Sequence, residues 1–425
     1  MANTLNLGTD GNWGVKKDSL LAYNSENGNF KPLPFDFTRD TVATVVNKAG
    51  LIETVGSGEP RIDFSNDAKG ALLLEPTRSN IVDNSSNFFL NSWSGTRVSE
   101  GSTITSPNGN NEAHKLIATS ISNTHYREYT VVSASSGSYT GSCFFKKGEF
   151  NVGSIRMSVD SYANRIGVYI NLDNGTHLQT STVGSPTGTS YKIEDYGSGW
   201  YRLSVTIIHT SGEVRMSLSN ASSDYTNSNG LPVFLGNDSD GGYSWGGQLE
   251  QGSYATSYIP TQWSAVTRVQ DACNNGANEQ VINSTEGVLF FELSALGSSS
   301  SYDAISLSDG TQNNEALFYY QTSGNTIAYQ YGVAGSVVSN LIFSSYDITV
   351  NSLFAITWKL NEFKFFKDGV KIGEDLSGAV ASSNTFTKLS LSRGDNSMPL
   401  NANLKQVKLY NTALTDAELI ALTSL

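Results

Sequence analysis

The fold is decided by the stretch Phe354-Ala355-Ile356-Thr357-Trp358, which is soon followed by Glu362-Phe363-Lys364-Phe365-Phe366-Lys367-Asp368-Gly369-Val370. Both runs are rich in the aromatic and β-branched residues that favour strands. Asp368-Gly369 predicts a tight hairpin turn, because Gly supplies the positive φ that such a turn requires. We therefore predict strands joined by short hairpins in this part of the chain.

The same short-strand pattern recurs along the chain of 425 residues. Its 40 Gly, 20 Tyr and 19 Phe, with charged residues at only 16%, are typical of strands and tight turns rather than helices. Several segments alternate apolar and polar residues, so one face of each predicted strand is buried and the other is exposed to solvent. We predict an all-β fold with strands at His125–Val132, Tyr139–Phe145, Val152–Val159, Arg165–Leu172, Trp200–Ile208, Gly287–Leu293, Ala304–Leu307, Ala316–Tyr320, Thr326–Tyr331, Phe354–Lys359, Glu362–Phe366, Lys388–Ser392 and Leu404–Tyr410.

The length favours two or three domains, because one hydrophobic core rarely serves so long a chain. Residues 1–80 are punctuated by Gly and Pro, and we predict a small N-terminal region there for attachment or oligomerisation. Residues 81–268 predict one β-sandwich and residues 284–425 a second. The Asn- and Gly-rich residues 269–283 predict an exposed linker. One short C-terminal helix is expected, with a capping box at Thr415-Asp416-Ala417-Glu418 and Leu414, Leu419 and Leu422 packed on the sandwich.

The formal net charge of −12 argues against nucleic acid or an anionic membrane as a partner, because phosphate binding needs clustered Lys and Arg. No apolar run is long enough to cross a bilayer, and the first residues show no export signal, so we expect no membrane insertion. Cys143 and Cys273 are too few for a disulfide framework, and we expect both to be free thiols.

The last domain resembles the laminin-G and concanavalin A-like lectin fold. The resemblance is carried by the hairpin quoted above and by the closing run from Ala402 to Glu418. The middle part resembles sugar-binding jelly-roll modules, through Gly199-Trp200-Tyr201-Arg202-Leu203-Ser204-Val205 and the segment from Trp245 to Glu250. These resemblances imply a jelly-roll sandwich followed by a concanavalin A-like sandwich.

A set of short motifs, taken in order, resembles bacteriophage minor structural and tail proteins. The motifs are Phe37-Thr38-Arg39, Gly50-Leu51-Ile52-Glu53, Leu73-Leu74-Glu75-Pro76-Thr77-Arg78-Ser79-Asn80, Gly247-Gln248-Leu249-Glu250 and Tyr258-Ile259-Pro260-Thr261. The resemblance implies a virion protein assembled in the host cytoplasm. Such proteins differ widely in their ligands.

Sugar binding relies on exposed aromatic rings that lie flat against pyranose rings. The candidates are Trp93 and Tyr126 in the middle domain and Tyr302, Tyr319, Tyr329 and Tyr331 in the last one. Packing in the core or between strands is the competing interpretation for each of them. Trp200, Trp245 and Trp358 lie in predicted strands, and we assign them to the core.

We expect no catalytic residues and no enzyme activity. The carboxylate patterns of sandwich glycosidases are absent, since Glu194-Asp195 and the isolated Glu292 and Asp303 fit turns or solvated positions. The four histidines are too widely spaced for a zinc site. A structural calcium ion is the one cofactor considered, with Asp238, Asp240 and Glu250 as ligands, against the simpler interpretation of a polar loop.

The leading hypothesis is a phage virion surface protein, a tail-fibre or head-fibre adhesin, that binds host cell-surface glycans. Other virion proteins and sister chains in a homotrimer are the further partners that this hypothesis predicts, because several copies raise the effective concentration for each contact. A purely structural decoration protein is the alternative, and a polysaccharide depolymerase is a third. The sequence does not decide among glycans.

Overall fold

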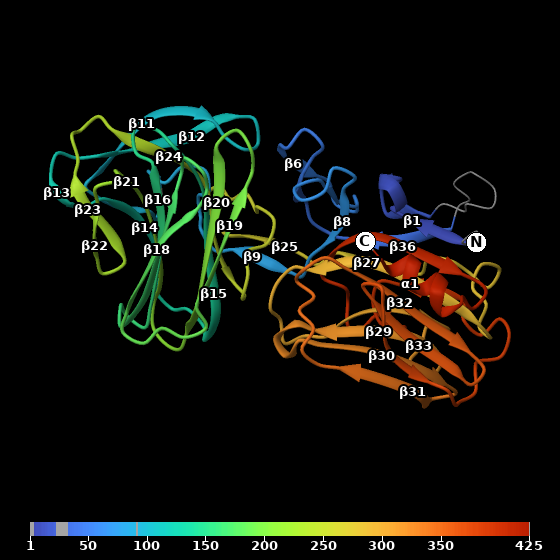
Figure 1. The fold of residues 1–425 in the computed structure, drawn as a ribbon. Coiled ribbons are helices and arrows are strands. Elements are labelled where there is room, and N and C mark those ends of the chain that lie inside the picture. Colours follow the sequence, from blue (N-terminus) through green and yellow to red (C-terminus); the bar gives the residue numbers. More distant parts are fainter. Residues whose placement is uncertain (1–3, 23–32, 91, 425) are drawn as a thin grey trace. The chain divides into compact units, whose positions relative to one another are not determined.

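The computed structural model describes residues 4–22, 33–90 and 92–424, and Figure 1 labels its elements. Backbone contacts divide the chain into two compact units. The C-terminal unit comprises residues 1–42, 55–76 and 269–425, and the middle unit comprises residues 43–54 and 77–268. Both units are built from antiparallel sheets, which confirms the predicted all-β fold class.

Two sheets form the sandwich of the C-terminal unit (Figure 1). The first sheet has the order β34 (Val370–Asp375), β33 (Glu362–Lys367), β32 (Ser352–Lys359), β27 (Gly287–Ala295), β36 (Ala402–Tyr410), β8 (Ala71–Leu74) and β7 (Ile62–Asp63), with β1 (Leu5–Leu7) paired to β36. The second has the order β31 (Ser336–Phe343), β30 (Thr326–Val333), β29 (Glu315–Gln321), β28 (Asp303–Ser308) and β35 (Lys388–Ser390). The predicted turn is present between β33 and β34, where Asp368 and Gly369 have φ of 48° and 76°.

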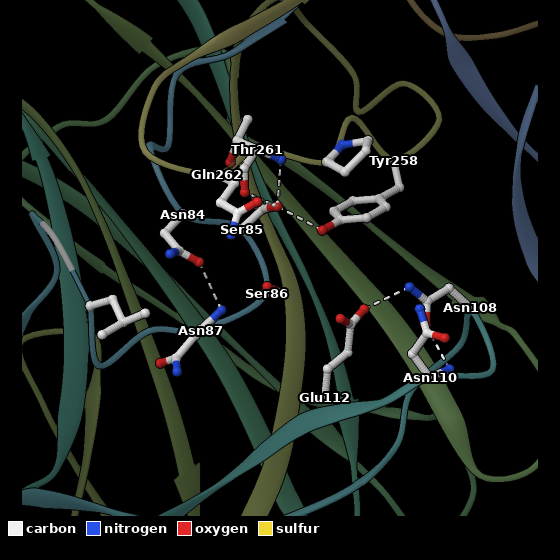
Figure 2. A pocket seen from close by; sticks show the side chains of 12 residues that line it. Asn84, Ser85, Ser86, Asn87, Asn108, Asn110, Glu112, Tyr258, Thr261 and Gln262 are labelled. Carbon is white, nitrogen blue, oxygen red and sulfur yellow. Dashed lines mark hydrogen bonds between the residues drawn. The ribbon is translucent and has the colours of Figure 1, made fainter. Parts of the chain in front are cut away.

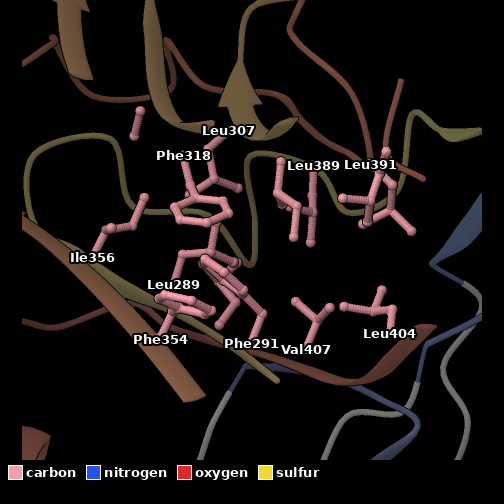
Figure 3. Close-up of a cluster of buried hydrophobic side chains, with 14 of the residues drawn as sticks. Leu289, Phe291, Leu307, Phe318, Phe354, Ile356, Leu389, Leu391, Leu404 and Val407 are labelled. Atoms are coloured by element: carbon pink, nitrogen blue, oxygen red, sulfur yellow. The ribbon is translucent and has the colours of Figure 1, made fainter. Parts of the chain in front are cut away.

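The core of this unit lies between the two sheets. Figure 3 shows Phe318 of the second sheet facing Phe291 and Phe354 of the first. The ring centroids of Phe291 and Phe318 are 4.6 Å apart, and those of Phe291 and Phe354 are 5.3 Å apart. Each such buried side chain contributes about 1.5–3 kcal/mol through removal of apolar surface from water.

The outer face of the first sheet is covered by α1 (Asp416–Thr423). The helix begins with the predicted capping box, because the Thr415 side chain accepts from the Glu418 backbone and the Glu418 side chain accepts from the Thr415 backbone. Its leucines pack on apolar side chains of β27, β32 and β33, in a cluster made of Val288, Phe290, Leu353, Ala355, Phe366, Tyr410, Leu414, Leu419 and Leu422. The predicted helix is therefore confirmed. Short 3₁₀ turns lie at η1 (Thr9–Gly11) and η3 (Thr322–Gly324).

The segment that we expected to be an exposed linker, residues 269–283, is partly buried in the C-terminal unit. Its strand β26 (Ala272–Asn274) pairs with β4 (Pro34–Thr38) in a sheet completed by β2 (Gly14–Lys16) and β3 (Ser19–Leu21). Cys273 lies in the core beside Phe35 and Phe37. The expectation of exposure was wrong because pairing with a distant strand satisfies backbone N–H and C=O groups of this segment, which have no partner nearby in the sequence.

Four buried charged side chains join distant segments of this unit. Asp271 accepts from Arg39 at 2.9 Å and also pairs with Arg61, and Arg61 pairs with Glu75 at 2.6 Å. Burial lowers the pKa of Arg61, but the carboxylates of Asp271 and Glu75 outweigh burial and raise it, so this guanidinium stays charged. Arg39 and Glu75, which stand in two of the ordered motifs, are thus held in this buried cluster.

Two sheets also form the sandwich of the middle unit (Figure 1). One has the order β10 (Ser94–Thr96), β14 (Tyr126–Val131), β21 (Val214–Ala221), β16 (Val152–Val159), β17 (Asn164–Asn171) and β18 (His177–Val183). The other has the order β11 (Val98–Thr105), β12 (Asn111–Ala118), β24 (Gly241–Gln251), β15 (Gly137–Lys146), β20 (Trp200–His209) and β19 (Ser190–Asp195). Smaller pairings join β13 (Ser122–Thr124), β23 (Leu231–Leu235) and β22 (Thr226–Ser228), β9 (Arg78–Asn80) and β25 (Val266–Arg268), and β5 (Ala43–Val46) and β6 (Ile52–Val55).

The N-terminal region that we predicted over residues 1–80 is divided between the two units. Strand β1 extends the first sheet of the C-terminal unit, whereas Val46 and Ile52 pack with Trp245 and Tyr258 in the middle unit. Several of its short strands pair with one another, as β2, β3 and β4 do and as β5 and β6 do, and β4, β8 and β9 also pair with strands beyond residue 80. Its role in attachment stays a prediction.

The predicted core assignments of three tryptophans are confirmed, since Trp200, Trp245 and Trp358 are all buried. Cys143 and Cys273 are buried free thiols, as expected.

Candidate functional site

The middle unit contains a polar cavity of about 490 Å³. Three loop segments form it: the chain after β9, the β11–β12 hairpin and the chain after β24. Figure 2 shows Asn84 and Asn87 on one side and Asn108 and Glu112 on the other. The lining residues are Asn84, Ser85, Ser86, Asn87, Leu90, Asn108, Asn110, Glu112, Tyr258, Pro260, Thr261 and Gln262.

Asparagine side chains shape the first and second segments through turn chemistry. The Asn84 side chain accepts from the Asn87 backbone N–H at 3.1 Å, and the Asn84 carbonyl accepts from Trp93 Nε1 at 2.9 Å. In the hairpin, Asn108 Oδ1 accepts from the Asn110 backbone N–H at 3.0 Å. These bonds fix the backbone and leave amide groups of the lining at the cavity.

Glu112, near the start of β12, is the one acidic residue among the described residues that line the cavity. Its Oε1 accepts from Trp245 Nε1 at 3.0 Å and from Asn108 Nδ2 at 2.6 Å. Within the described part of the chain, Oε2 has no hydrogen-bond partner. One oxygen therefore anchors the carboxylate and the other is left to accept from a ligand.

Buried hydroxyl groups close the third side. Ser85 Oγ lies 2.6 Å from the Tyr258 hydroxyl and accepts from the Thr261 backbone N–H at 2.9 Å. Burial raises the pKa of Tyr258, so this phenol stays neutral. Thr261 Oγ1 is buried and lacks a partner among the described residues, which is costly unless water or a ligand satisfies it.

The chemistry of the lining favours a neutral ligand rich in hydroxyl groups. Amide and hydroxyl side chains both donate and accept, as sugar hydroxyls do. No Lys, Arg or His stands among the described lining residues, so the cavity offers no cation to an acidic group.

Trp263 follows the lining residue Gln262 directly in the chain. Its side chain is 65% exposed, and its φ of 72° is a conformation that bulky residues rarely adopt. Such a conformation costs about 1–3 kcal/mol, so the surrounding structure must hold it in place. Sequence reasoning missed Trp263, because nothing in the sequence distinguishes an exposed Trp from the buried ones.

The structure separates the six aromatic residues that we predicted for sugar binding. Trp93, Tyr329 and Tyr331 are buried in hydrophobic cores, so these three predictions are corrected: the rings have no free face for a ligand. Tyr126 is half-buried, with the Arg156 guanidinium 5.4 Å from its ring centroid. Tyr302 is 43% exposed and packs edge-to-face on Tyr319, with centroids 5.7 Å apart. Tyr126, Tyr302 and Tyr319 stay predictions.

The three predicted calcium ligands do not converge. Asp240 directly precedes β24, whereas Glu250 is the tenth residue of that strand, so about 33 Å of extended chain separates them. Glu250 is buried and accepts from the Thr256 backbone N–H at 3.0 Å and from Gln248 Nε2 at 2.7 Å. Asp238 accepts from the Ser120 backbone N–H at 3.1 Å. We therefore correct this site, and the described residues include no group of three or more His, Cys, Asp or Glu that could hold a metal ion.

The lining residues were also missed from the sequence. Asn84-Ser85-Ser86-Asn87 and Asn108-Gly109-Asn110 have the composition of ordinary turns, and only their meeting in space creates the cavity. The available signal was the unusual density of Asn beside Glu112.

No protein-family model matches the sequence, and neither does any curated protein. Among solved structures, the chain is similar to the IT-sialidase CBM40 of Ruminococcus gnavus bound to α2,3-sialyllactose, with 16% identity, coverage of 33% of this chain and 83% of that chain, and a TM-score of 0.29. Domain 4 of AbnA, a GH43 extracellular arabinanase from Geobacillus stearothermophilus in complex with arabinotriose, is 11% identical over 40% of this chain and 82% of that one, with a TM-score of 0.29.

The mouse laminin α1 chain domains LG4-5 are 7% identical over 69% of this chain and 85% of that chain, with a TM-score of 0.21. At these identities and TM-scores the likenesses carry no functional conclusion. Among the described residues, no helix is both long enough and apolar enough to span a membrane.

Proposed function

We propose that this protein binds glycans without cutting them, and that a neutral oligosaccharide occupies the cavity of the middle unit. The observation that carries the proposal is the lining itself, which combines amide and hydroxyl groups with one anchored carboxylate and the apolar residues Leu90 and Pro260. Ligand sites with a few fixed polar groups of this kind gain specificity from the direction of each hydrogen bond.

Each part of the site has a role in this proposal. Glu112 Oε2 accepts hydrogen bonds from one or two sugar hydroxyls, and such charge-assisted bonds are about twice as strong as neutral ones. Asn84, Asn87 and Asn110 donate to and accept from other hydroxyls. Trp263, beside Gln262, offers its exposed ring to the apolar face of a pyranose that extends out of the cavity.

The absence of catalysis is part of the same proposal. Glycoside hydrolysis uses a pair of carboxyl groups flanking the scissile bond, one of them as general acid. Glu112 is the single acid among the described lining residues, and Oε1 is already bonded to Trp245 and Asn108. This arrangement supports binding rather than acid–base chemistry.

We further propose that the glycan belongs to a host cell surface and that the protein is an adhesin on a phage virion, as a tail fibre or head fibre. The support is the order of the short motifs along the sequence. A homotrimer attached to other virion proteins would bring several cavities to one surface, which raises the effective concentration for each further contact.

The test is a glycan array probed with the full chain, followed by incubation of the best ligands with the chain and measurement of reducing ends. We expect binding to neutral oligosaccharides with no release of reducing ends. Binding to no glycan would overturn the proposal in favour of a structural decoration protein. Release of reducing ends that is lost in Glu112→Gln would overturn it in favour of a depolymerase.

A further inference from the structure

A second polar site lies on the other sheet of the middle unit. On β16, Ile155 and Met157 face the core, so the alternate residues Ser154, Arg156 and Ser158 lie on the outer face. The strand register sets Arg156 beside Ser217 of β21, and Ser217 beside Glu128 of β14. Ser158 lies between Arg215 of β21 and Arg165 of β17.

Three guanidinium groups surround one tyrosine ring on this face. The guanidinium carbons of Arg215, Arg165 and Arg156 lie 4.4, 5.5 and 5.6 Å from the Tyr162 ring centroid. We call these three residues, with Tyr162, the arginine cluster. The aromatic ring stabilises the nearby cations through its negative face.

Tyr162 is held over the arginines by a strained turn between β16 and β17. Asp160, Ser161 and Tyr162 have φ of 53°, 53° and 68°, which is unfavourable for three successive residues other than Gly. Asp160 fixes the turn, accepting from the Thr210 and Ser211 backbone N–H groups at 3.0 and 3.1 Å. Burial raises the pKa of Asp160, but its hydrogen bonds outweigh burial and lower it to about 2, so the carboxylate is ionised throughout the physiological range.

The cluster has more positive charge than its carboxylates neutralise. Glu128 is buried and accepts from Tyr162 at 2.6 Å, Arg156 at 3.0 Å and Arg215 at 3.1 Å. Arg215 also pairs with Glu213. Three guanidinium groups thus share two carboxylates.

Two arginines keep unused donors. Arg165 is half-buried, has no acidic partner within the described part of the chain, and uses Nε to donate to the Tyr162 carbonyl at 2.8 Å. Arg156 Nε is buried without a partner among the described residues, and so are the hydroxyls of Ser154 and Ser158 on the same strand face. Buried polar groups left unsatisfied cost about 1–3 kcal/mol each, so these atoms favour internal water. Arg165 and Arg215 are half-buried and are the guanidinium groups of the cluster that a ligand can reach.

We propose that the arginine cluster binds the carboxylate of an acidic sugar, at a subsite separate from the cavity. The planar fork of a guanidinium matches a carboxylate with two parallel hydrogen bonds. Arg165 supplies the unpaired charge, and the half-buried rings of Tyr126 and Tyr162 flank the site and contact the sugar ring. The protein would then recognise a glycan that contains both neutral and acidic residues.

The experiment is calorimetric titration of the full chain with a panel of hexuronic and sialic acid oligosaccharides, each compared with its neutral methyl ester. We expect at least one acid to bind about tenfold or more tightly than its ester, and Arg165→Gln to lose that preference. Lys192→Gln is the matched control, since Lys192 lies on β19 in the other sheet and pairs with Glu194 at 2.8 Å.

The proposal fails if every acid and its ester bind equally, or if Arg165→Gln and Lys192→Gln behave alike. Displacement of the acid by an equal concentration of inorganic sulfate at constant ionic strength would also overturn it, because the site would then take any small anion. Glu112→Gln separates this subsite from the cavity. We expect that variant to keep acid binding even if the proposed function of the cavity proves wrong.

Discussion

Asp303 links the stability of the C-terminal unit to pH. This residue begins β28 and is buried, and its Oδ1 accepts from both the backbone N–H and the side-chain Nδ2 of Asn401, at 2.8 and 2.6 Å. Burial raises the pKa of Asp303 to about 7, although the bonds from Asn401 oppose the shift. In the unfolded chain an Asp has a pKa of about 3.9. At any pH between these two pKa values, Asp303 is therefore protonated in the folded state and ionised in the unfolded state.

The direction and size follow from proton linkage. Where the folded state binds one proton more, the free energy of unfolding falls by about 1.4 kcal/mol for each unit of rising pH. Over about 3 units the loss is about 4 kcal/mol, complete once the pH passes the folded pKa. The contribution of Asp303 is thus fully present below pH 4 and lost above pH 7.

Asp303→Asn is the matched variant, because an amide keeps the accepting Oδ1 and carries no charge. We expect denaturant unfolding, followed by circular dichroism, to show that the free energy of unfolding of the wild type falls relative to that of Asp303→Asn as the pH rises from 4.5 to 7.5. If the difference in free energy of unfolding stays constant across that range, the burial argument for Asp303 is refuted.

Two further predictions concern other buried groups. Asp271→Asn removes the negative charge that two buried guanidinium groups share, so we expect a loss of about 3–5 kcal/mol in the free energy of unfolding. The exposed control Asp40→Asn should change this free energy negligibly. Equal midpoints of urea unfolding for the two variants would contradict the prediction. Burial raises the pKa of both Cys143 and Cys273, so neither thiol should react with an aromatic disulfide reagent in the native protein. Both thiols should react in denaturant. Rapid labelling of the native chain would contradict the prediction and show that a core is open to the reagent.

The fold class could be predicted because the decisive signal is local. Phe363 and Phe365 of β33 are buried, and the turn at Asp368-Gly369 pairs β33 with β34. The capping box of α1 is a pattern of four residues. Both kinds of signal are complete within a few residues of sequence. Long-range order is not needed to recognise them.

The division of the chain could not be predicted, because it depends on pairs far apart in the sequence. Strand β1 pairs with β36, which lies at the opposite end of the chain, and Asp271 is buried only because Arg39 and Arg61 reach it. An Asn-rich segment such as 269–283 looks like a linker until those partners are known.

The ordered motifs of the sequence prove to be structural. Asn80 Nδ2 donates to the Ile259 carbonyl at 2.9 Å, Asn80 Oδ1 accepts from the Leu249 backbone N–H at 3.1 Å, and Gln248 Oε1 accepts from the Ile259 backbone N–H at 2.7 Å. The motif residues Asn80, Gln248, Leu249 and Ile259 therefore join strand ends within the middle unit, whereas Arg39 and Glu75 belong to the buried charge cluster of the C-terminal unit. Those of the middle unit position the loop from Tyr258 to Gln262 that lines the cavity, and they do not themselves specify a ligand.

The candidate site was harder to predict because alternation does not identify the exposed face of a strand. Tyr329 and Tyr331 differ from Tyr319 only in which side of the sheet they occupy, and that side is set by pairing across the sheet. Glu112 lies near the start of β12 and Trp263 in the chain after β24, so neither has a motif of its own.

The most direct measurement of the central claim is the affinity of the full chain for the neutral oligosaccharide that it binds best, compared with Glu112→Gln and Trp263→Ala. Gln at position 112 can keep the bonds that Trp245 and Asn108 donate to Oε1, so the fold should be preserved. We expect each variant to bind about tenfold or more weakly, and Trp263→Phe to retain most of the affinity. Unchanged affinity in both Glu112→Gln and Trp263→Ala would contradict the claim that this cavity is the glycan site.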